Sequence, residues 1–201
     1  MQGIMDFLKY IPALIVAIVI HEFAHAAVAY LFGDKSAKHQ GRVSLNPFRH
    51  LDPLGILALV IFRFGWAKPV PINSSNFKNY NVGMFCVSIA GIVTNFLFAL
   101  ICSRLLKLNI INNGYILSFL YMSIIINLNL AFFNLIPLPP LDGSNILLSF
   151  FNQSTAYEVQ RYSRYTNLIL LVLIFSGSVS KMLGMLVLPT FEWMLSLWVI
   201  F

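Results

Sequence analysis

The feature that most constrains this chain is a long apolar run that contains three polar, titratable residues. The stretch IPALIVAIVIHEFAHAAVAYLF, residues 11–32, places His21, Glu22 and His25 where lipid-facing side chains would be expected. Ionisable side chains inside the hydrocarbon layer are costly, and they usually face other protein groups or a water-filled cavity. The run therefore predicts a membrane helix with a functional site inside it.

The composition indicates an integral membrane protein. The chain has 201 residues, of which 59% are hydrophobic and 10% are charged, and its mean hydropathy is +0.81. Soluble domains are about half apolar and about a quarter charged. The formal net charge of +6 is therefore interpreted as basic loops held on the cytoplasmic side of the cell membrane, with no nucleic-acid partner.

Hydropathy predicts an all-α polytopic protein with about four to six transmembrane helices, since a span needs about 20 apolar residues. The full-length candidates are residues 4–32, 82–106, 114–135 and 166–188. Pro189 is expected to separate a last apolar piece, residues 190–201. We expect one domain, residues 1–201, with its catalytic core at about 4–148 and its C-terminal helices at about 166–201.

Residues 51–67, LDPLGILALVIFRFGWA, are apolar but short for a span. We expect a re-entrant or extended membrane-associated segment there. The loops 33–50, 68–81 and 152–165 carry most of the Lys and Arg residues. All three loops can be cytoplasmic only if residues 51–67 return to the side from which they entered. The first helix then ends at the cytoplasmic side.

HEFAH is an H-E-x-x-H pattern. On a helix, His21 and His25 share one face and can bind one metal ion, while Glu22 can act as a general base on a water molecule beside that ion. The alternative is a buried cluster that only hydrogen-bonds to neighbouring helices. The chain has only seven acidic residues, and an unpartnered carboxylate inside a membrane is costly, which favours the metal site.

A catalytic zinc ion usually has three protein ligands and one open position, so one more ligand is required. His39 and His50 belong to the basic loop and are expected at the surface. Asp142 is favoured, because it follows IPLPPL, where extended backbone at membrane depth can line a wet cavity. The helix that precedes Asp142, residues 114–135, is also expected to end on the same side of the membrane as the helix of His21. The alternative interpretation of Asp142 is an ordinary Asp-Gly turn.

Five motifs follow one another along the chain: HEFAH, GRVSLNPFRHLDPLG at 41–55, FGWAKPVPIN at 64–73, AGIVTN at 90–95 and FNLIPLPPLDG at 133–143. Together they resemble the site-2 protease family of intramembrane zinc metalloproteases, and more closely its small bacterial branch without PDZ or CBS domains. The resemblance implies one Zn²⁺ per chain, bound by His21, His25 and Asp142, with Glu22 as the catalytic base. It also implies a multi-pass protein of a bacterial cytoplasmic membrane.

The resemblance assigns further candidates. Asn134 opens the family's second motif, and Asn95 matches an asparagine of its central helix, so both are candidate auxiliary, oxyanion or substrate contacts. The family commonly has A-G-P before that asparagine, whereas this chain has Ile92 in place of the proline.

The family cleaves transmembrane helices of protein substrates near the cytoplasmic face of the bilayer, in regulated intramembrane proteolysis. An extended substrate could add to the segment KPVPIN through backbone hydrogen bonds, with Val70 and Ile72 as candidate contacts. Two alternative functions remain at this point: a metal-binding membrane transporter and an inactive protease-like scaffold.

Overall fold

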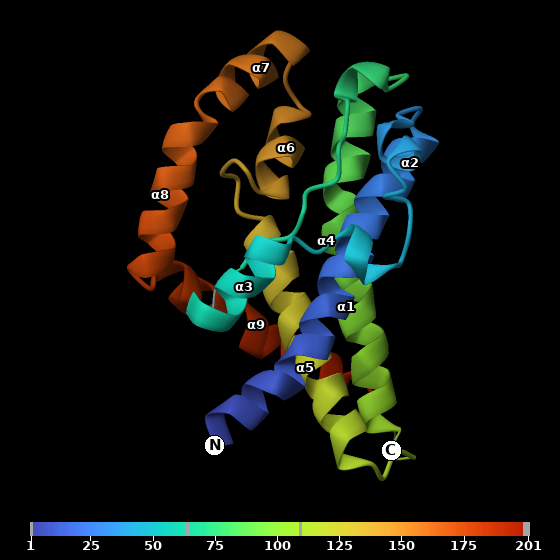
Figure 1. The fold of residues 1–201 in the computed structure, drawn as a ribbon, viewed down its shortest axis with the longest axis vertical. Helices are drawn as coiled ribbons and strands as arrows, with labels where there is room; N and C mark the ends of the chain where they lie inside the picture. The colour runs from blue at the N-terminus through green and yellow to red at the C-terminus, as the bar shows by residue number, and fades with distance from the viewer. Residues whose placement is uncertain (1, 63–64, 109, 199–201) are drawn as a thin grey trace.

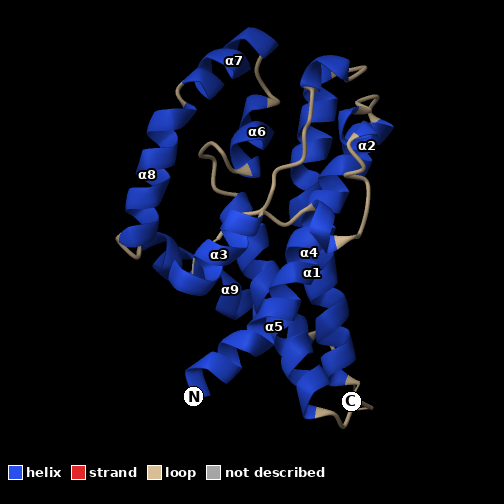
Figure 2. Cartoon of the chain, viewed as in Figure 1, coloured by secondary structure: helices blue, strands red, loops and turns tan. Residues whose placement is uncertain are grey.

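The computed structural model describes residues 2–62, 65–108 and 110–198. Within these residues the regular secondary structure is helical, with no strand (Figure 2). The predicted all-α fold class is therefore confirmed. Residues 63–64 of the predicted returning segment and residues 199–201 of the predicted last piece lie outside the described residues.

Three long helices form the centre of the molecule: α1 (Gln2–Leu31), α4 (Tyr80–Lys107) and α5 (Gly114–Asn134). Helix α4 runs antiparallel to the other two (Figure 1). Residues Tyr10–Leu31 of α1, and α4 and α5 in full, are long and apolar enough to cross a membrane. The helices α8 (Ser163–Phe175) and α9 (Ser178–Ser196) are bent by 71° and count as a fourth span only if taken together. Four spans would be the lower limit of the expected four to six, and three lie below it.

The three central helices pack along stripes of mostly small or polar residues that recur at every fourth position. On α1 the buried stripe is Ala13, Ala17, His21, His25 and Ala29. The facing stripes are Val87, Gly91, Asn95, Ala99 and Ser103 on α4, and Ser123, Asn127 and Ala131 on α5. Residues four apart share a helix face, and small residues let membrane helices approach closely. HEFAH therefore lies in the helix interface.

Helix α3 (Pro53–Phe62) is too short to cross a membrane. The chain returns after it, since Leu51 and Ala67 form an antiparallel bridge and the N–H of Lys68 donates to the carbonyl of His50 at 2.8 Å. Both ends of the segment 51–67 therefore lie together, as a re-entrant segment requires.

The C-terminal part differs from the sequence-based expectation at two points: the expected span 166–188 is broken by the 71° bend between α8 and α9, and Pro189 does not end a helix. After α6 (Asp142–Leu148) and α7 (Gln153–Arg161), the chain bends at Gly177, whose φ is +75°, and Pro189 lies inside α9. The prediction of a break at Pro189 is wrong. Glycine adopts the left-handed conformation without steric cost, whereas a proline within a membrane helix is tolerated when neighbouring groups satisfy the freed carbonyl.

The connections between the long helices contain shorter helical elements. They are α2 (Ser36–His39) and two 3₁₀ turns, Pro47–Arg49 and Ser74–Asn76. Helices α2 and α7 lie at the same end of the molecule (Figure 1). The basic loops 33–50 and 152–165 therefore lie at the same end of the bundle.

Candidate metal centre

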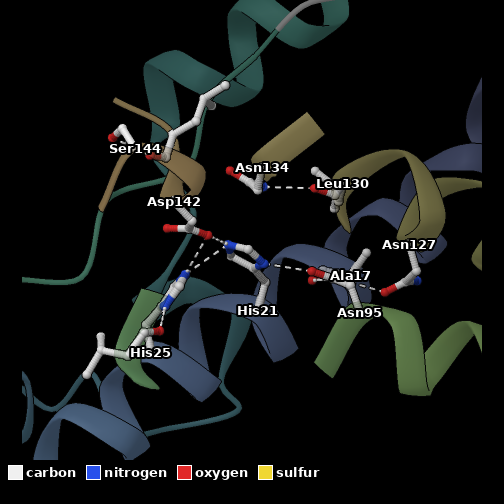
Figure 3. Close-up of polar contacts among 11 residues, drawn as sticks. Ala17, His21, His25, Asn95, Asn127, Leu130, Asn134, Asp142 and Ser144 are labelled. Carbon is white, nitrogen blue, oxygen red and sulfur yellow. Dashed lines mark hydrogen bonds and ion pairs between the residues drawn. The ribbon is translucent and has the colours of Figure 1, made fainter. Parts of the chain in front are cut away.

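Three buried or half-buried side chains from two helices converge on one point (Figure 3). His21 and His25 lie one turn apart on α1, and Asp142 lies at the start of α6. The two Nε2 atoms are 3.0 Å apart, and each is 3.2 Å from Oδ2 of Asp142. Tetrahedral zinc with bonds of about 2.0–2.1 Å holds its ligand atoms roughly 3.3 Å apart. The three atoms therefore have the spacing of a zinc site.

The protonation pattern of the site also suits a cation. Nδ1 of His25 lies 2.7 Å from the carbonyl oxygen of Val87. Because a carbonyl only accepts, this Nδ1 carries the proton and leaves a lone pair on Nε2. Oδ2 of Asp142 is buried and has no hydrogen-bond donor among the described residues. Unpaired acceptors are costly when buried unless they bind a cation, so the residues present fit a metal ion.

The position of Asp142 depends on close packing between two helix ends. A Cβ atom on Gly143 would lie 2.3 Å from the carbonyl oxygen of Leu135, so glycine lets the first turn of α6 pack against the C-terminal end of α5. The irregular backbone ends at Leu141, because an acidic residue is favoured in a first helical turn, near the free N–H groups.

Helix α4 supports both imidazoles from behind, at two positions eight residues apart. Nδ1 of His21 lies 2.6 Å from Oδ1 of Asn95, and Nδ1 of His25 bonds to the Val87 carbonyl. Between them, a Cβ atom on Gly91 would lie 2.5 Å from Cε1 of His21 and 2.7 Å from Nε2 of His25. Gly91 and Val87 were missed as site residues. The four-residue spacing back from Asn95 is the signal that could have found them.

A cavity of about 370 Å³ opens beside the three converging side chains. The catalytic-base candidate Glu22 lines it, and so do Asn134, Val70 and Ile72. Asn95 is fully buried and lies behind His21, where it can act as an auxiliary residue. All the other candidates taken from the sequence therefore meet at this one cavity.

One side of the cavity is a loop, residues 68–74, which we call the loop wall. The fully buried Asp34 anchors its end, because Oδ2 of Asp34 accepts from the N–H of Asn73 at 2.7 Å and Oδ1 accepts from Nδ2 of Asn76 at 2.9 Å. Burial acts to raise the pKa of the Asp34 carboxyl, but hydrogen bonds from Ser36, Asn73 and Asn76 hold that pKa below its usual value. The loop wall is thus tied to the end of α1.

The two other histidines do not join the site. His39 is exposed on α2. His50 is fully buried, and its Nε2 lies 2.6 Å from the carbonyl oxygen of Ser44. The expectation that His50 lies at the surface is therefore wrong, because the returning chain at Lys68 pairs with it.

Comparisons with known proteins agree with this chemistry. A model described as Peptidase family M50 matches residues 104–176, which include Asp142 but not HEFAH. The chain is 41% identical over 171 residues to "Putative zinc metalloprotease YwhC" of Bacillus subtilis (strain 168), covering 80% of this chain and 77% of that protein. It is 25% identical over 190 residues to "Putative zinc metalloprotease Rip2" of Mycolicibacterium smegmatis (strain ATCC 700084 / mc(2)155), covering 87% of this chain and 70% of that protein. No solved structure matches the chain.

Proposed function

We propose that this chain, which belongs to peptidase family M50, the site-2 protease family, hydrolyses peptide bonds of transmembrane helices near the cytoplasmic side of a membrane. Membership of this family makes the chain a zinc metallopeptidase, and its apolar helices make it a membrane protein. The proposed substrates are transmembrane proteins that are cleaved within the bilayer, as in regulated intramembrane proteolysis.

The observation that carries the proposal is the convergence of three acceptor atoms and one further carboxylate on a single cavity. His21, His25 and Asp142 are the proposed ligands of one Zn²⁺ ion per chain. When bound, zinc acts as a Lewis acid toward the scissile carbonyl and lowers the pKa of a water molecule from about 15.7 toward about 7. The chain's own residues supply the remaining functions.

Glu22 is the proposed general base. It follows His21 directly on α1, and its side chain lines the same cavity without belonging to the converging group. From there the carboxylate can accept a proton from the attacking water and later deliver that proton to the leaving amine. The amide of Asn134 also lines the cavity. It is a candidate donor to the oxyanion that develops on the substrate.

The loop wall is the proposed docking edge for the substrate backbone. Val70 and Ile72 line the cavity, and alternate residues of an extended segment point to the same face. Among the described residues, no backbone hydrogen bond engages Val70 or Ile72. A substrate helix has to unwind before cleavage, and an unpaired edge offers its freed N–H and C=O groups new partners.

We place the protein in a bacterial cytoplasmic membrane, with the basic loops on the cytoplasmic side. The support is the location of loops 33–50 and 152–165 at one end of the bundle, and the joined ends of the segment 51–67. In this orientation α1 and α5 both end at the cytoplasmic side. Substrate and lipid are then the partners of the protein, and nucleic acid is not.

The proposal is tested with purified protein in liposomes, a single-span reporter substrate and a zinc measurement. Wild type should bind one zinc per chain and cleave the reporter. Glu22→Gln should keep zinc but lose cleavage by about 100-fold or more, since general acid–base catalysis contributes 10²–10⁴-fold. Asp142→Ala should lose zinc and cleavage together.

Three outcomes would overturn the proposal. Full cleavage by Glu22→Gln would remove the proposed base. Zinc flux across the liposome that persists in Glu22→Gln, with no cleavage by wild type, would identify a metal transporter instead. A wild-type protein that binds zinc but neither cleaves nor transports would indicate a scaffold.

A further inference from the structure

Two asparagines are fully buried between the three central helices, Asn95 on α4 and Asn127 on α5. Buried amides are costly unless they are hydrogen-bonded, so their partners indicate their role. We infer that Asn127 is a positioning residue that acts through Asn95 to hold the His21 imidazole with its proton on Nδ1 and its lone pair on Nε2. The inference rests on the proposed function, in which Nε2 of His21 binds zinc.

The relay is the series of hydrogen bonds that runs from Ser123 through Asn127 and Asn95 to His21. Its first step orients Asn127. Its Nδ2 donates to the carbonyl of Ser123, four residues earlier on α5, at 2.8 Å. Because that carbonyl only accepts, it selects the NH₂ end of the Asn127 amide. The Oδ1 end of Asn127 is therefore the one that faces α4.

The second step orients Asn95. Its Nδ2 donates to Oδ1 of Asn127 at 2.6 Å and to the carbonyl of Ala17 on α1 at 3.1 Å (Figure 3). These two acceptors use both hydrogens of the NH₂ group. The Oδ1 end of Asn95 is left facing Nδ1 of His21 at 2.6 Å. Both acceptors therefore disfavour the flipped orientation of the Asn95 amide, in which Oδ1 and Nδ2 exchange places.

The third step sets the state of His21. An acceptor at Nδ1 favours the tautomer with the proton on Nδ1, and the Nε2 lone pair then faces Asp142 and His25. A flipped Asn95 amide would instead present its NH₂ group to Nδ1. The proton of His21 would then move to Nε2 and point at the metal position. Metal-bound histidines usually donate their other N–H to such an outer partner.

The two histidines differ in how this orientation is maintained. His25 donates to a backbone carbonyl, at Val87, which no side-chain change removes. His21 depends on the side chains of Asn95 and Asn127, which come from two other helices. The zinc affinity of the site should therefore depend on packing between α4 and α5.

The test compares Asn127→Leu with Asn129→Leu, using zinc affinity from chelator competition on the full chain in detergent. Leu resembles Asn in size but lacks the amide. Asn129 is the matched control, because it makes the same bond to a carbonyl four residues earlier, that of Ile125, at 2.7 Å, outside the relay. Asn127→Leu should lower the zinc affinity about tenfold, which is the lower limit of the effect usually seen when a hydrogen-bond partner of a metal ligand is removed. Asn129→Leu should leave zinc affinity within about twofold.

A second pair of variants tests whether Asn127 acts through Asn95. Asn95→Leu should lower the zinc affinity at least as much as Asn127→Leu does. The double variant should bind zinc as tightly as Asn95→Leu alone. Asn127→Ser repeats the test with a small side chain, and thermal unfolding verifies the fold of each variant. The visible spectrum of bound Co²⁺ should change in Asn127→Leu but not in Asn129→Leu.

Equal zinc affinity in Asn127→Leu and Asn129→Leu, or additive effects of the Asn95 and Asn127 changes, would overturn the inference. His21→Ala separates this failure from failure of the proposed function. If His21→Ala binds zinc as tightly as wild type, the metal site itself is wrong. If His21→Ala loses zinc while Asn127→Leu does not, only the relay is wrong.

Discussion

The two sides of the cavity are built in different ways. The helical side, formed by α1, α4 and α6, holds the imidazoles of His21 and His25 at their far nitrogens and packs them against Gly91. The loop wall, residues 68–74, is attached near its ends, through His50 and Asp34. Between these anchors the backbone of Val70 and Ile72 has no hydrogen-bond partner among the described residues.

This difference matches two separate physical requirements. Metal binding and proton transfer need atoms held to within a fraction of an ångström, and buried helix interfaces supply that rigidity. Docking of an unwound substrate needs unpaired backbone groups, which a loop held at its ends supplies. Changes on the helical side should therefore remove zinc. Changes in the loop wall should alter cleavage while zinc stays bound.

The largest effect is expected from Gly91→Ala, on the helical side. The added methyl would lie 2.5 Å from Cε1 of His21, and the hydrogen bond between Nδ1 of His21 and Asn95 opposes a shift of the ring away from α4. Overpacking costs about 1–3 kcal/mol, so zinc affinity should fall by up to roughly 100-fold, with cleavage lost in parallel. Zinc content and reporter cleavage measure the effect.

The matched control is Gly184→Ala on α9, where an added Cβ meets nothing within 4 Å. This variant should keep zinc and cleavage, and it should be slightly more stable, by about 0.5–1 kcal/mol. Normal zinc binding by Gly91→Ala would show that the helical side is more adaptable than its packing indicates.

An intermediate effect is expected from Val70→Pro in the loop wall. Proline removes the N–H group that would pair with the substrate, and one such bond contributes about 0.5–1.5 kcal/mol. Cleavage should become up to about tenfold slower, and zinc should remain bound. Val70→Ile keeps the N–H group and serves as the control. Cleavage by Val70→Pro at the rate of Val70→Ile would remove the loop wall from substrate docking.

The smallest effect is expected from Asp34→Asn, at the anchor of the loop wall. The pKa of Asp34 is held below its usual value of about 3.9. The ionised carboxylate therefore stabilises the fold at pH values above about 3.9, and this contribution is lost as the pH falls through the lowered pKa. An amide has one acceptor oxygen where the carboxylate has two. At pH 7 the variant should lose about 1–2 kcal/mol.

Thermal unfolding of wild type and Asp34→Asn between pH 3 and pH 7 measures this effect. The midpoint of the variant should be a few degrees lower at neutral pH, and the difference should shrink as the pH approaches 3. Cleavage should change by less than about threefold. A difference between the two midpoints that does not depend on pH would contradict the role given to the carboxylate.

The fold class and the approach of His21 to His25 could be predicted because their signals are local or compositional. Long apolar segments predicted the three central helices, and H-E-x-x-H spacing on a helix brings His21 and His25 together. The helical start at Asp142 could not be predicted in this way. It depends on the contact between Gly143 and the end of α5. The bend at Gly177 was missed because proline is a stronger sequence signal than an isolated glycine.

The sequence by itself determined that this is an all-α membrane protein with a His–Glu–His cluster in its first helix, since apolar length and four-residue spacing are properties of one segment. Five motifs along the sequence also resemble the site-2 protease family. Only the tertiary structure decided what surrounds that cluster. The partners of His21 outside its own helix come from α4 and α6, and Asn127 of α5 bonds to the α4 partner, at sequence distances that no local pattern encodes. Those partners determine which ring nitrogen carries the proton, and a protonated nitrogen cannot bind a metal ion.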